Sequence, residues 1–600
     1  MNYIIFGAGQ TGLETLEILD SNKVSFFIDN NIKKINTKLG QKNILSFENG
    51  IKERKNELIV IAVSKIYENE LINQLKKNNI KEFCTFSELK MKITKEKIAN
   101  RPDYLEIYKK AIRWIHNNTI LGEGIINNSK LKKSYPEVTG YFIPTLLNWG
   151  YREEAISYAK WLCKIQKGNG SWFDTDNESA YVFDSAQILK GLIAVRDIYP
   201  ELDIIDEVIV KGCDWIVSCM TPEGQLKTPN ESAWGNIATE LIHTYCLSPL
   251  KEAGRIYSKT QYEEAANKIL DYYIKNNYNE ITNFCMLSHF YAYVIEAMLD
   301  MGEEKIAKKA MCNVEKYQKE SGAVPAYSDV NWVCSTGLFQ LALIWFRIGD
   351  WNRGNKAFEY ACKLQNSSGG WFGSYISEEN NNEINTYFPN SEISWAVKYF
   401  LDALYYRNIL QFEMQADLFR SDLSDCDDKY IILNNIVRSL PYNKKILDVG
   451  CGKGRYIKKL KMNNPRNSYY AIDISKKVMN YIADGNNIEK KIGNITYIPY
   501  DNNTFDVVYA CEVLEHAIDI KSSIKEMARV TTPKGKIVII DKNKSMYGFF
   551  DIEEWEQWFD KEELSKIMYE FCEEVLYIDN INYDNEESNG LFGAWIGTVK

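Results

Sequence analysis

Three glycines with an aspartate before them follow a short apolar segment in the C-terminal third of the 600-residue chain. The run from Asp448 to Gly454 reads DVGCGKG, and Asp473 lies at the end of the next apolar segment. Glycine removes the side chains that would keep a turn away from a bulky cofactor, and it tolerates positive φ. A carboxylate after the second strand is placed to bind ribose hydroxyls. The pattern indicates a cofactor that contains a nucleoside.

Glycine spacing alone does not separate a nicotinamide cofactor from a methionine-derived one. An acidic residue followed by x-Gly-x-Gly-x-Gly resembles motif I of class I S-adenosylmethionine (SAM)-dependent methyltransferases. Further segments resemble that family in order: Ala471–Ser475, Gly493–Pro499, Phe505–Val508 with Cys511–His516, and Pro533–Lys536. The resemblance covers about 160 residues from near Asn443 and implies an α/β doubly wound domain that binds SAM.

The resemblance also assigns residues to the parts of the cofactor. It places Asp448 at the methionine end, Asp473 at the ribose, and Asn494 and Ile495 near the adenine. The remaining cofactor-binding residues that it implies are Gly450, Gly452, Gly454 and Glu512. Asn494 stands where the family usually has an acidic residue, but an amide still offers an acceptor to the adenine amino group.

His516 is the candidate base, because imidazole titrates near neutral pH and the residue follows a predicted core strand. Methyl transfer from a sulfonium is an in-line displacement that depends largely on positioning and desolvation. An oxygen or carbon acceptor also needs a base. The alternative is that His516 only bonds to the backbone and shapes the pocket.

A second glycine loop lies at the N-terminus, where Gly7, Gly9 and Gly12 follow an apolar strand and open a helix. Asp29 lies at the end of the second predicted strand, which completes a dinucleotide-binding pattern. The segment resembles small Rossmann-like modules attached to bacterial surface-polysaccharide enzymes. That resemblance implies a nucleotide or nucleotide-sugar ligand, with a purely structural role as the alternative. The segment is too short to carry a separate hydride-transfer site as well.

The middle of the chain is a repeat of helical hairpins. Gly170, Gly224, Gly322 and Gly369 each follow a predicted helix, and the second of the three steps between them is about twice as long as the others. The long step predicts a degenerate copy around residues 276–280. A period of about 50 residues is typical of stacked helical hairpins, and the turns resemble those of α/α toroids in terpenoid cyclases and six-hairpin glycosidases or lyases. We expect a closed α/α barrel of about six hairpins rather than an open solenoid.

Polar residues on otherwise apolar helices mark a second candidate site. Glu240 and His243 lie one helical turn apart, as do Asp184 with Gln187 and His289 with Tyr293. Glu240 and His243 are candidates for acid and base acting on a glycan, or else satisfied structural residues. Eleven of the 14 Trp fall between residues 114 and 395, where they line a sugar-binding or isoprenoid-binding surface or act as core spacers.

Composition excludes several classes of protein. A net charge of −9 argues against non-specific nucleic-acid binding. No apolar run is long enough for a membrane span, and no Cys or His spacing indicates a metal site. Thirteen dispersed Cys indicate reduced thiols and a cytoplasmic protein. The sequence leaves the oligomeric state open.

The predicted architecture has three domains. They are a Rossmann-like nucleotide-binding module at 1–100, an all-α barrel of helical hairpins at 103–408, and a class I methyltransferase at 412–600. The predicted function is methylation of a glycan or nucleotide-sugar acceptor in cell-surface polysaccharide biosynthesis. One alternative makes the barrel a glycoside hydrolase or lyase with methylation secondary. Another makes it a non-catalytic module that presents glycan or isoprenoid acceptors.

Overall fold

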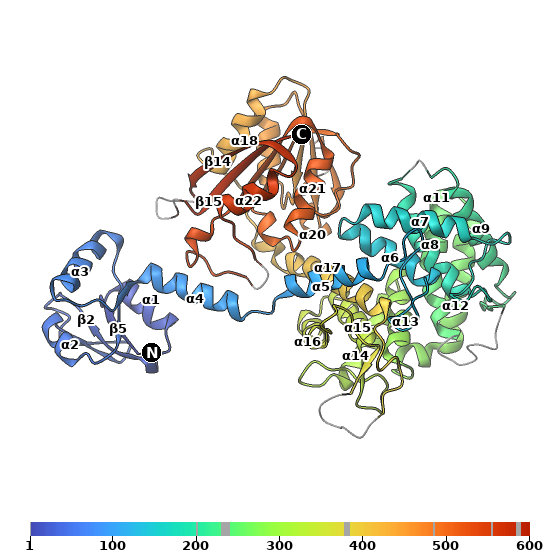
Figure 1. The fold of residues 1–600 in the computed structure, drawn as a ribbon, viewed down its shortest axis with the longest axis horizontal. Helices are drawn as coiled ribbons and strands as arrows, with labels where there is room; N and C mark the ends of the chain where they lie inside the picture. The colour runs from blue at the N-terminus through green and yellow to red at the C-terminus, as the bar shows by residue number, and fades with distance from the viewer. Residues whose placement is uncertain are drawn as a thin grey trace.

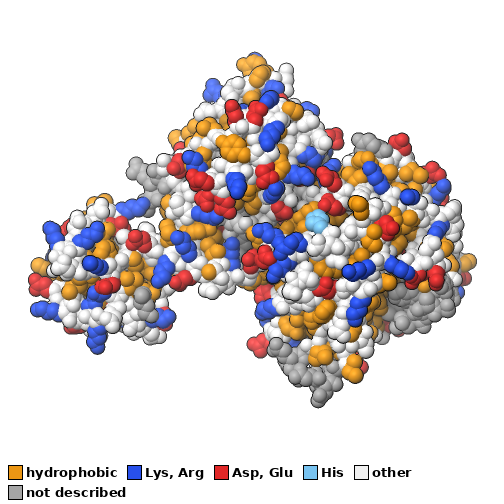
Figure 2. Space-filling view, viewed as in Figure 1, with side chains coloured by type: hydrophobic (Ala, Val, Ile, Leu, Met, Phe, Trp, Pro, Cys, Tyr) orange, Lys and Arg blue, Asp and Glu red, His pale blue; other side chains and the backbone are white. Residues whose placement is uncertain are grey.

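The computed structural model describes residues 2–199, 202–229, 240–376, 384–483, 487–553, 556–583, 588 and 590–600. Figure 1 shows an α/β unit at the N-terminus, a helical region, and an α/β unit at the C-terminus. The N-terminal unit stands apart, and helix α4 (Phe86–Asn100) leads from it to the rest. On the face seen in Figure 2, acidic and basic side chains are interspersed over all three parts.

The N-terminal unit is a six-stranded sheet in the order β3-β4-β2-β1-β5-β6. Its strands pair in parallel except for β3 with β4. The strands are β1 (Tyr3–Phe6), β2 (Val24–Ile28), β3 (Lys38–Leu39), β4 (Lys42–Leu45), β5 (Leu58–Ile61) and β6 (Phe83–Thr85). Helices α1 (Gln10–Ile18), α2 (Phe47–Glu53) and α3 (Lys65–Lys77) connect them. Adjacent residues such as Ile4 and Ile5 belong to separate apolar cores, so both faces of the sheet are covered.

The helical region consists of successive helical hairpins. Its helices are α5 (Tyr104–Asn117), α6 (Pro136–Asn148), α7 (Arg152–Ile165), α8 (Val182–Arg196), α9 (Ile205–Ser218), α11 (Leu247–Tyr257), α12 (Thr260–Thr282), α13 (Ser288–Asp300), α14 (Glu304–Val314), α15 (Ser335–Arg347), α16 (Trp351–Cys362) and α17 (Ser394–Gln415). A 3₁₀ helix, η3 (Ile242–Cys246), precedes α11. Helix α17 continues beyond Asn408, where the sequence predicted this region to end.

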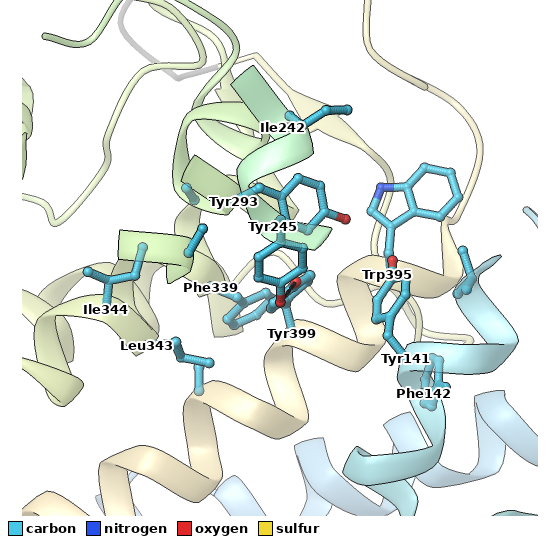
Figure 3. Packing of buried hydrophobic residues seen from close by; sticks show 14 of the residues in the cluster. Tyr141, Phe142, Ile242, Tyr245, Tyr293, Phe339, Leu343, Ile344, Trp395 and Tyr399 are labelled. Atoms are coloured by element: carbon cyan, nitrogen blue, oxygen red, sulfur yellow. Dashed lines mark hydrogen bonds between the residues drawn. The ribbon is translucent and has the colours of Figure 1, made fainter. Parts of the chain in front are cut away.

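Contacts between the more buried helices run in a closed circle. Helix α6 packs on α8, and α8 packs on η3 and α11. In turn η3 packs on α13, α13 on α15, α15 on α17, and α17 returns to α6. Figure 3 shows Tyr245, Tyr293 and Tyr399 pointing toward one another inside this circle, beside Tyr141 and Trp395.

The repeated glycines adopt the same conformation in each copy. Gly170, Gly224, Gly322 and Gly369 have φ of 95°, 105°, 96° and 101°, which favours glycine. The degenerate copy does not form the turn expected at 276–280. Helix α12 only kinks there, at Asn277, and continues to Thr282. The corresponding turn lies at 283–287.

The C-terminal unit is a seven-stranded sheet in the order β11-β10-β9-β12-β13-β15-β14. The strands are β9 (Lys445–Val449), β10 (Ser468–Asp473), β11 (Ile488–Ile492), β12 (Phe505–Cys511), β13 (Thr531–Lys542), β14 (Cys572–Ile581) and β15 (Phe592–Val599). Strand β15 is antiparallel to both of its neighbours, and the other pairs are parallel. Helices α18 (Asp428–Ser439), α19 (Arg455–Asn463), α20 (Lys476–Met479), α21 (Ile520–Val530) and α22 (Lys561–Met568) belong to the same unit. This is a class I methyltransferase-like α/β fold within a multidomain, mostly helical protein.

Candidate functional site

The turn after β9 has a backbone that requires glycine. Gly450, Gly452 and Gly454 have φ of 67°, 55° and 75°. A Cβ on Gly450 would lie 2.5 Å from Cγ1 of Val513, and one on Gly454 would lie 2.9 Å from Cδ1 of Ile482. A Cβ on Gly452 would meet none of the described residues within 4 Å. The open side of the turn is therefore at Gly452, where a ligand can approach the backbone.

Two carboxylates flank this turn. Asp473, at the end of β10, accepts hydrogen bonds from the backbone N–H of Gly452 (2.9 Å) and of Ser475 (2.9 Å). Asp448, in β9, is 2% exposed, and its Oδ2 has no hydrogen-bond partner among the described residues. Burial, with the charge of Asp473, raises the pKa of Asp448 to about 8. A cationic ligand group beside Asp448 would satisfy this carboxyl.

The loop that carries Asn494 and Ile495 lies after β11. Oδ1 of Asn494 accepts from the backbone N–H of Thr496 (3.2 Å), and Nδ2 donates to the carbonyl of Asn148 (3.1 Å) in the helical region. The hydroxyl of Thr496 donates to the same carbonyl at 2.9 Å. The loop is therefore fixed by a segment that lies far earlier in the sequence.

Glu512 follows β12 with φ of 60°. Its Oε1 accepts from Nη2 of Arg455 (2.5 Å) and from the hydroxyl of Tyr456 (3.2 Å), and Nζ of Lys429 lies 3.5 Å away. Burial opposes ionisation, but Lys429 and Arg455 outweigh it and lower the pKa of Glu512. Glu512 is thus held as a carboxylate.

His516 lies beside a buried charge network. Its Nε2 is 3.3 Å from Oε1 of Glu515, and Nζ of Lys542 lies 3.1 Å from the same oxygen. Lys542 also pairs with the buried Glu556. Against the effect of burial, His516 and Lys542 lower the pKa of Glu515. Nδ1 of His516 is buried and has no hydrogen-bond partner among the described residues.

Most of these residues line one pocket of about 400 Å³. The predicted residues on its wall are Asp448, Gly450, Gly452, Asp473, Asn494, Ile495, Glu512 and His516. Gly454 is not on the wall. The helical region and the segment after it contribute Trp149, Asn408, Phe412 and Leu418–Arg420, which the sequence analysis did not identify. No motif marks these positions, because they reach the pocket only through packing between regions.

The pocket wall suits SAM. The open backbone at Gly452, the carboxylate of Asp473 and the Oδ2 atom of Asp448 offer places for a nucleoside and a cationic amino acid group.

The N-terminal loop also donates a backbone N–H to a carboxylate, but only Gly7 of its three glycines has a positive φ. Gly7 has φ of 121°, and a Cβ there would lie 2.6 Å from Cγ1 of Val63. Gly12 packs against the carbonyl of Gly7, whereas a Cβ on Gly9 would come no nearer than 4.0 Å to a described atom. Asp29 accepts from the N–H of Ala8 (2.8 Å) and pairs with Nζ of Lys34 (3.2 Å).

Glu240 and His243 meet at Tyr273 in the helical region. The hydroxyl of Tyr273 donates to Oε1 of Glu240 (2.9 Å) and lies 3.4 Å from Nδ1 of His243. Gln225 also donates to Glu240, at 2.8 Å. Burial lowers the pKa of His243 to about 4, so this imidazole is neutral near pH 7. These contacts suit structural roles.

A carboxylate pair that the sequence analysis missed lies on α6 and α8. Gly140 and Gly191 bring these helices into backbone contact. Glu137 lies one turn before Gly140, and Asp184 lies two turns before Gly191. Both carboxyls are 4% exposed, and Oε1 of Glu137 has no hydrogen-bond partner among the described residues. Burial raises the pKa of both, and for Glu137 the charge of Asp184 adds to the effect. The sequence indicated only Asp184, because it forms a polar pair with Gln187 one helical turn later. Glu137 has no amide or charged partner at that spacing on its own helix.

Comparison with known proteins finds a family and several relatives that are similar to the C-terminal unit. The family model described as a methyltransferase domain matches residues 447–539. An uncharacterized protein of Methanocaldococcus jannaschii is 37% identical over 106 residues, which cover 17% of this chain and 44% of that protein. An uncharacterized methyltransferase of Schizosaccharomyces pombe is 30% identical over 113 residues, with coverage of 16% and 41%. A demethylmenaquinone methyltransferase of a Geobacillus species is 31% identical over 115 residues, with coverage of 18% and 49%.

The chain thus spans less than half the length of each of these relatives. A solved structure of phosphoethanolamine N-methyltransferase 2 from Haemonchus contortus, in complex with SAM, has a TM-score of 0.26 and 12% identity. It covers 33% of this chain and 59% of that one. The family match, on a sheet of the order described above, shows that the C-terminal region of this chain is a class I SAM-dependent methyltransferase domain.

Proposed function

We propose that this protein transfers a methyl group from SAM to a hydroxyl of a glycan or nucleotide-sugar in cell-surface polysaccharide biosynthesis. One observation supports the part of the proposal that names SAM as the methyl donor. Residues from four separate segments, around Gly452, Asp473, Asn494 and Glu512, line a single pocket of about 400 Å³. These are the segments whose order in the sequence resembles the methyltransferase family.

Each part of the pocket would hold one part of the donor. Asp473 would bind the ribose hydroxyls, and the loop of Asn494 and Ile495 would hold the adenine. Asp448 would pair with the amino group at the methionine end. When bound, SAM supplies an activated methyl group on a sulfonium, so the protein has mainly to position the acceptor and exclude water.

His516 would take the proton from the acceptor hydroxyl. The carboxylate of Glu515 lies against Nε2 and so places the imidazole proton on that nitrogen. The lone pair then lies on Nδ1, which is buried and has no partner among the described residues, so the imidazole would turn toward the pocket when the acceptor binds. Lys542 holds Glu515 ionised, and Glu515 in turn stabilises the imidazolium that forms. His516 would be the catalytic base and Glu515 a positioning residue.

The acceptor class rests on the other two regions. The glycine loop of the N-terminal unit supports nucleotide or nucleotide-sugar binding there, through Gly7, Gly9, Gly12 and Asp29. For the helical region we propose a closed α/α toroid, supported by the circle of contacts from α6 back to α6. Its interior is rich in aromatic rings, the type of side chain on which sugars stack, although these rings pack against one another and are buried.

Methyl transfer is tested with SAM labelled at the methyl group and a panel of nucleotide-sugars and cell-envelope glycans. We expect label in a hydroxyl-bearing glycan product. His516→Ala should lower kcat by about 10²–10⁴-fold, the usual contribution of a general base, and should leave SAM binding within twofold. Glu515→Gln should shift the pH profile of kcat. Transfer at the wild-type rate in His516→Ala would remove the base from the proposal.

A second activity is favoured by the pair of Glu137 and Asp184. Two neighbouring carboxyls can act as acid and base on a glycosidic bond when one keeps its proton and the other is ionised, and burial together with the charge of Asp184 raises the pKa of Glu137 in this way. This supports the alternative of a glycoside hydrolase or lyase in the helical region. Release of reducing ends from the same glycan panel, lost in Glu137→Gln, is the expected sign of such an activity. If no glycan is cleaved, the alternative of a binding module that presents acceptors is favoured.

A further inference from the structure

The turn at the C-terminal end of α6 contacts the adenine side of the pocket. The backbone carbonyl of Asn148 accepts two side-chain hydrogen bonds from the methyltransferase unit, from Nδ2 of Asn494 (3.1 Å) and from Oγ1 of Thr496 (2.9 Å). Trp149, the next residue, is itself on the pocket wall. Thr496 is 2% exposed, whereas Asn148 and Asn494 are partly exposed. The two bonds are therefore partly shielded from water and depend on the fit between the two surfaces.

Gly150 allows the two surfaces to approach this closely. It has φ of 83°, and a Cβ there would lie 2.5 Å from the carbonyl oxygen of Thr496. Gly302 and Gly349 end α13 and α15 with similar φ, 90° and 86°. A Cβ on either would have no described atom within 4 Å. The same glycine turn thus occurs in three hairpins, and the copy after α6 packs against the methyltransferase unit.

Further contacts surround this turn. The guanidinium of Arg152 lies 5.8 Å from the ring centroid of Tyr497. Glu153 lies 3.7 Å from Nζ of Lys525 on α21. The contact of Arg152 adds to the bonds to Asn148 in holding the loop 493–497 from outside the methyltransferase unit. The exposed ion pair of Glu153 reaches α21 and not this loop.

The contact also accounts for the asparagine at position 494. The methyltransferase family usually has an acidic residue there, and a carboxylate has no N–H to donate. In this chain the amide Nδ2 donates to the carbonyl of Asn148, while Oδ1 accepts from Thr496. A carboxylate would place two acceptors face to face at a partly buried site, which is unfavourable.

We infer that Asn148 and Gly150 of the helical region are positioning residues for the cofactor. They hold the loop of Asn494 in the conformation that receives the adenine. The inference rests on the proposed binding of SAM in this pocket. The helical region is therefore a structural part of the cofactor site, and donor affinity depends on the packing between the two regions.

The test is calorimetric titration of SAM into the full chain carrying Gly150→Ala, with Gly302→Ala as the matched control. Both substitutions place a Cβ on a turn glycine with positive φ, but only the first pushes on the loop. We expect the Kd for SAM to rise at least fivefold in Gly150→Ala and to stay within twofold in Gly302→Ala. Hydrogen exchange of the amides of residues 493–497 should accelerate in Gly150→Ala alone.

Asn494→Asp is the second variant, and it carries the test if Gly150→Ala fails to fold. It introduces the residue type usual in the family, yet we expect weaker SAM binding because the bond to Asn148 is lost. Wild-type affinity in both Gly150→Ala and Asn494→Asp would overturn the inference while the proposed function stands. Absence of SAM binding in the wild-type chain would instead overturn the proposed function.

Discussion

The two glycine loops of this chain are each held by a hydrogen bond to an aspartate, but they lie in different surroundings. In each, the carboxylate after the second strand accepts a hydrogen bond from a backbone N–H of the loop, Asp29 from Ala8 at 2.8 Å and Asp473 from Gly452 at 2.9 Å. Asp29 is also paired with Lys34. Among the described residues no Lys or Arg forms an ion pair with Asp473, which lies on the wall of the 400 Å³ pocket. A glycine fingerprint specifies a turn, whereas the surrounding segments supply the pocket.

The sharpest test of this difference is to remove each carboxylate. Asp473→Ala should raise the Kd for SAM about 100-fold, because it deletes the proposed ribose ligand and the bond that orients the glycine turn. Asp29→Ala should leave SAM binding unchanged. Calorimetry on both variants measures the effect. Equal losses in the two variants would mean that the N-terminal loop also contributes to the donor site.

A second prediction compares glycines. Gly450→Ala introduces a Cβ at φ of 67° and 2.5 Å from Val513, so it should cost about 2–4 kcal/mol in strain and overpacking. Gly9→Ala has open space and φ of −112°, so it should change stability by less than about 0.5 kcal/mol. Denaturant unfolding followed separately for each unit distinguishes the two. A larger cost for Gly9→Ala than for Gly450→Ala would contradict the geometry of both loops.

The smallest expected effect concerns a proton. Asp448 has a pKa of about 8 and is mostly protonated at pH 7. If it pairs with the amino group of SAM, binding at pH 7 should release about one proton, and affinity should rise from pH 6 toward pH 8. Titrations in buffers of different ionisation enthalpy measure this release, and Asp448→Asn should abolish it. Release that persists in Asp448→Asn would assign the proton to another group.

The sequence predicted the strands that carry the site because their apolar runs are long and bounded. The apolar segment before the glycine turn is β9, and the next apolar segment, which ends at Asp473 as the sequence predicted, is β10. Strand β11 was missed because its sequence, IEKKI, is polar and lies at the edge of the sheet. The sequence distances between the repeated glycines predicted the helical hairpins. They did not predict that the turn after α12 lies at 283–287 rather than at 276–280.

Contacts between regions could not be predicted. Asn148 presents a backbone carbonyl, which any residue type carries, so the sequence contains no sign of its bonds to Asn494 and Thr496. Lys34 is one of many surface lysines, and its pairing with Asp29 depends on the path of the loop after β2.

The sequence also predicted no membrane-spanning segment. Over the residues that the structure describes, none of the helices combines the length and the apolar character that a membrane span needs.

The most direct test of the central claim is hydrogen exchange of the full chain with and without SAM. Binding at the C-terminal loop predicts protection of amides in residues 450–454 and 493–496, with residues 7–12 unchanged. Protection of residues 7–12 alone, or no protection at a saturating concentration of SAM, would contradict the assignment of the donor site.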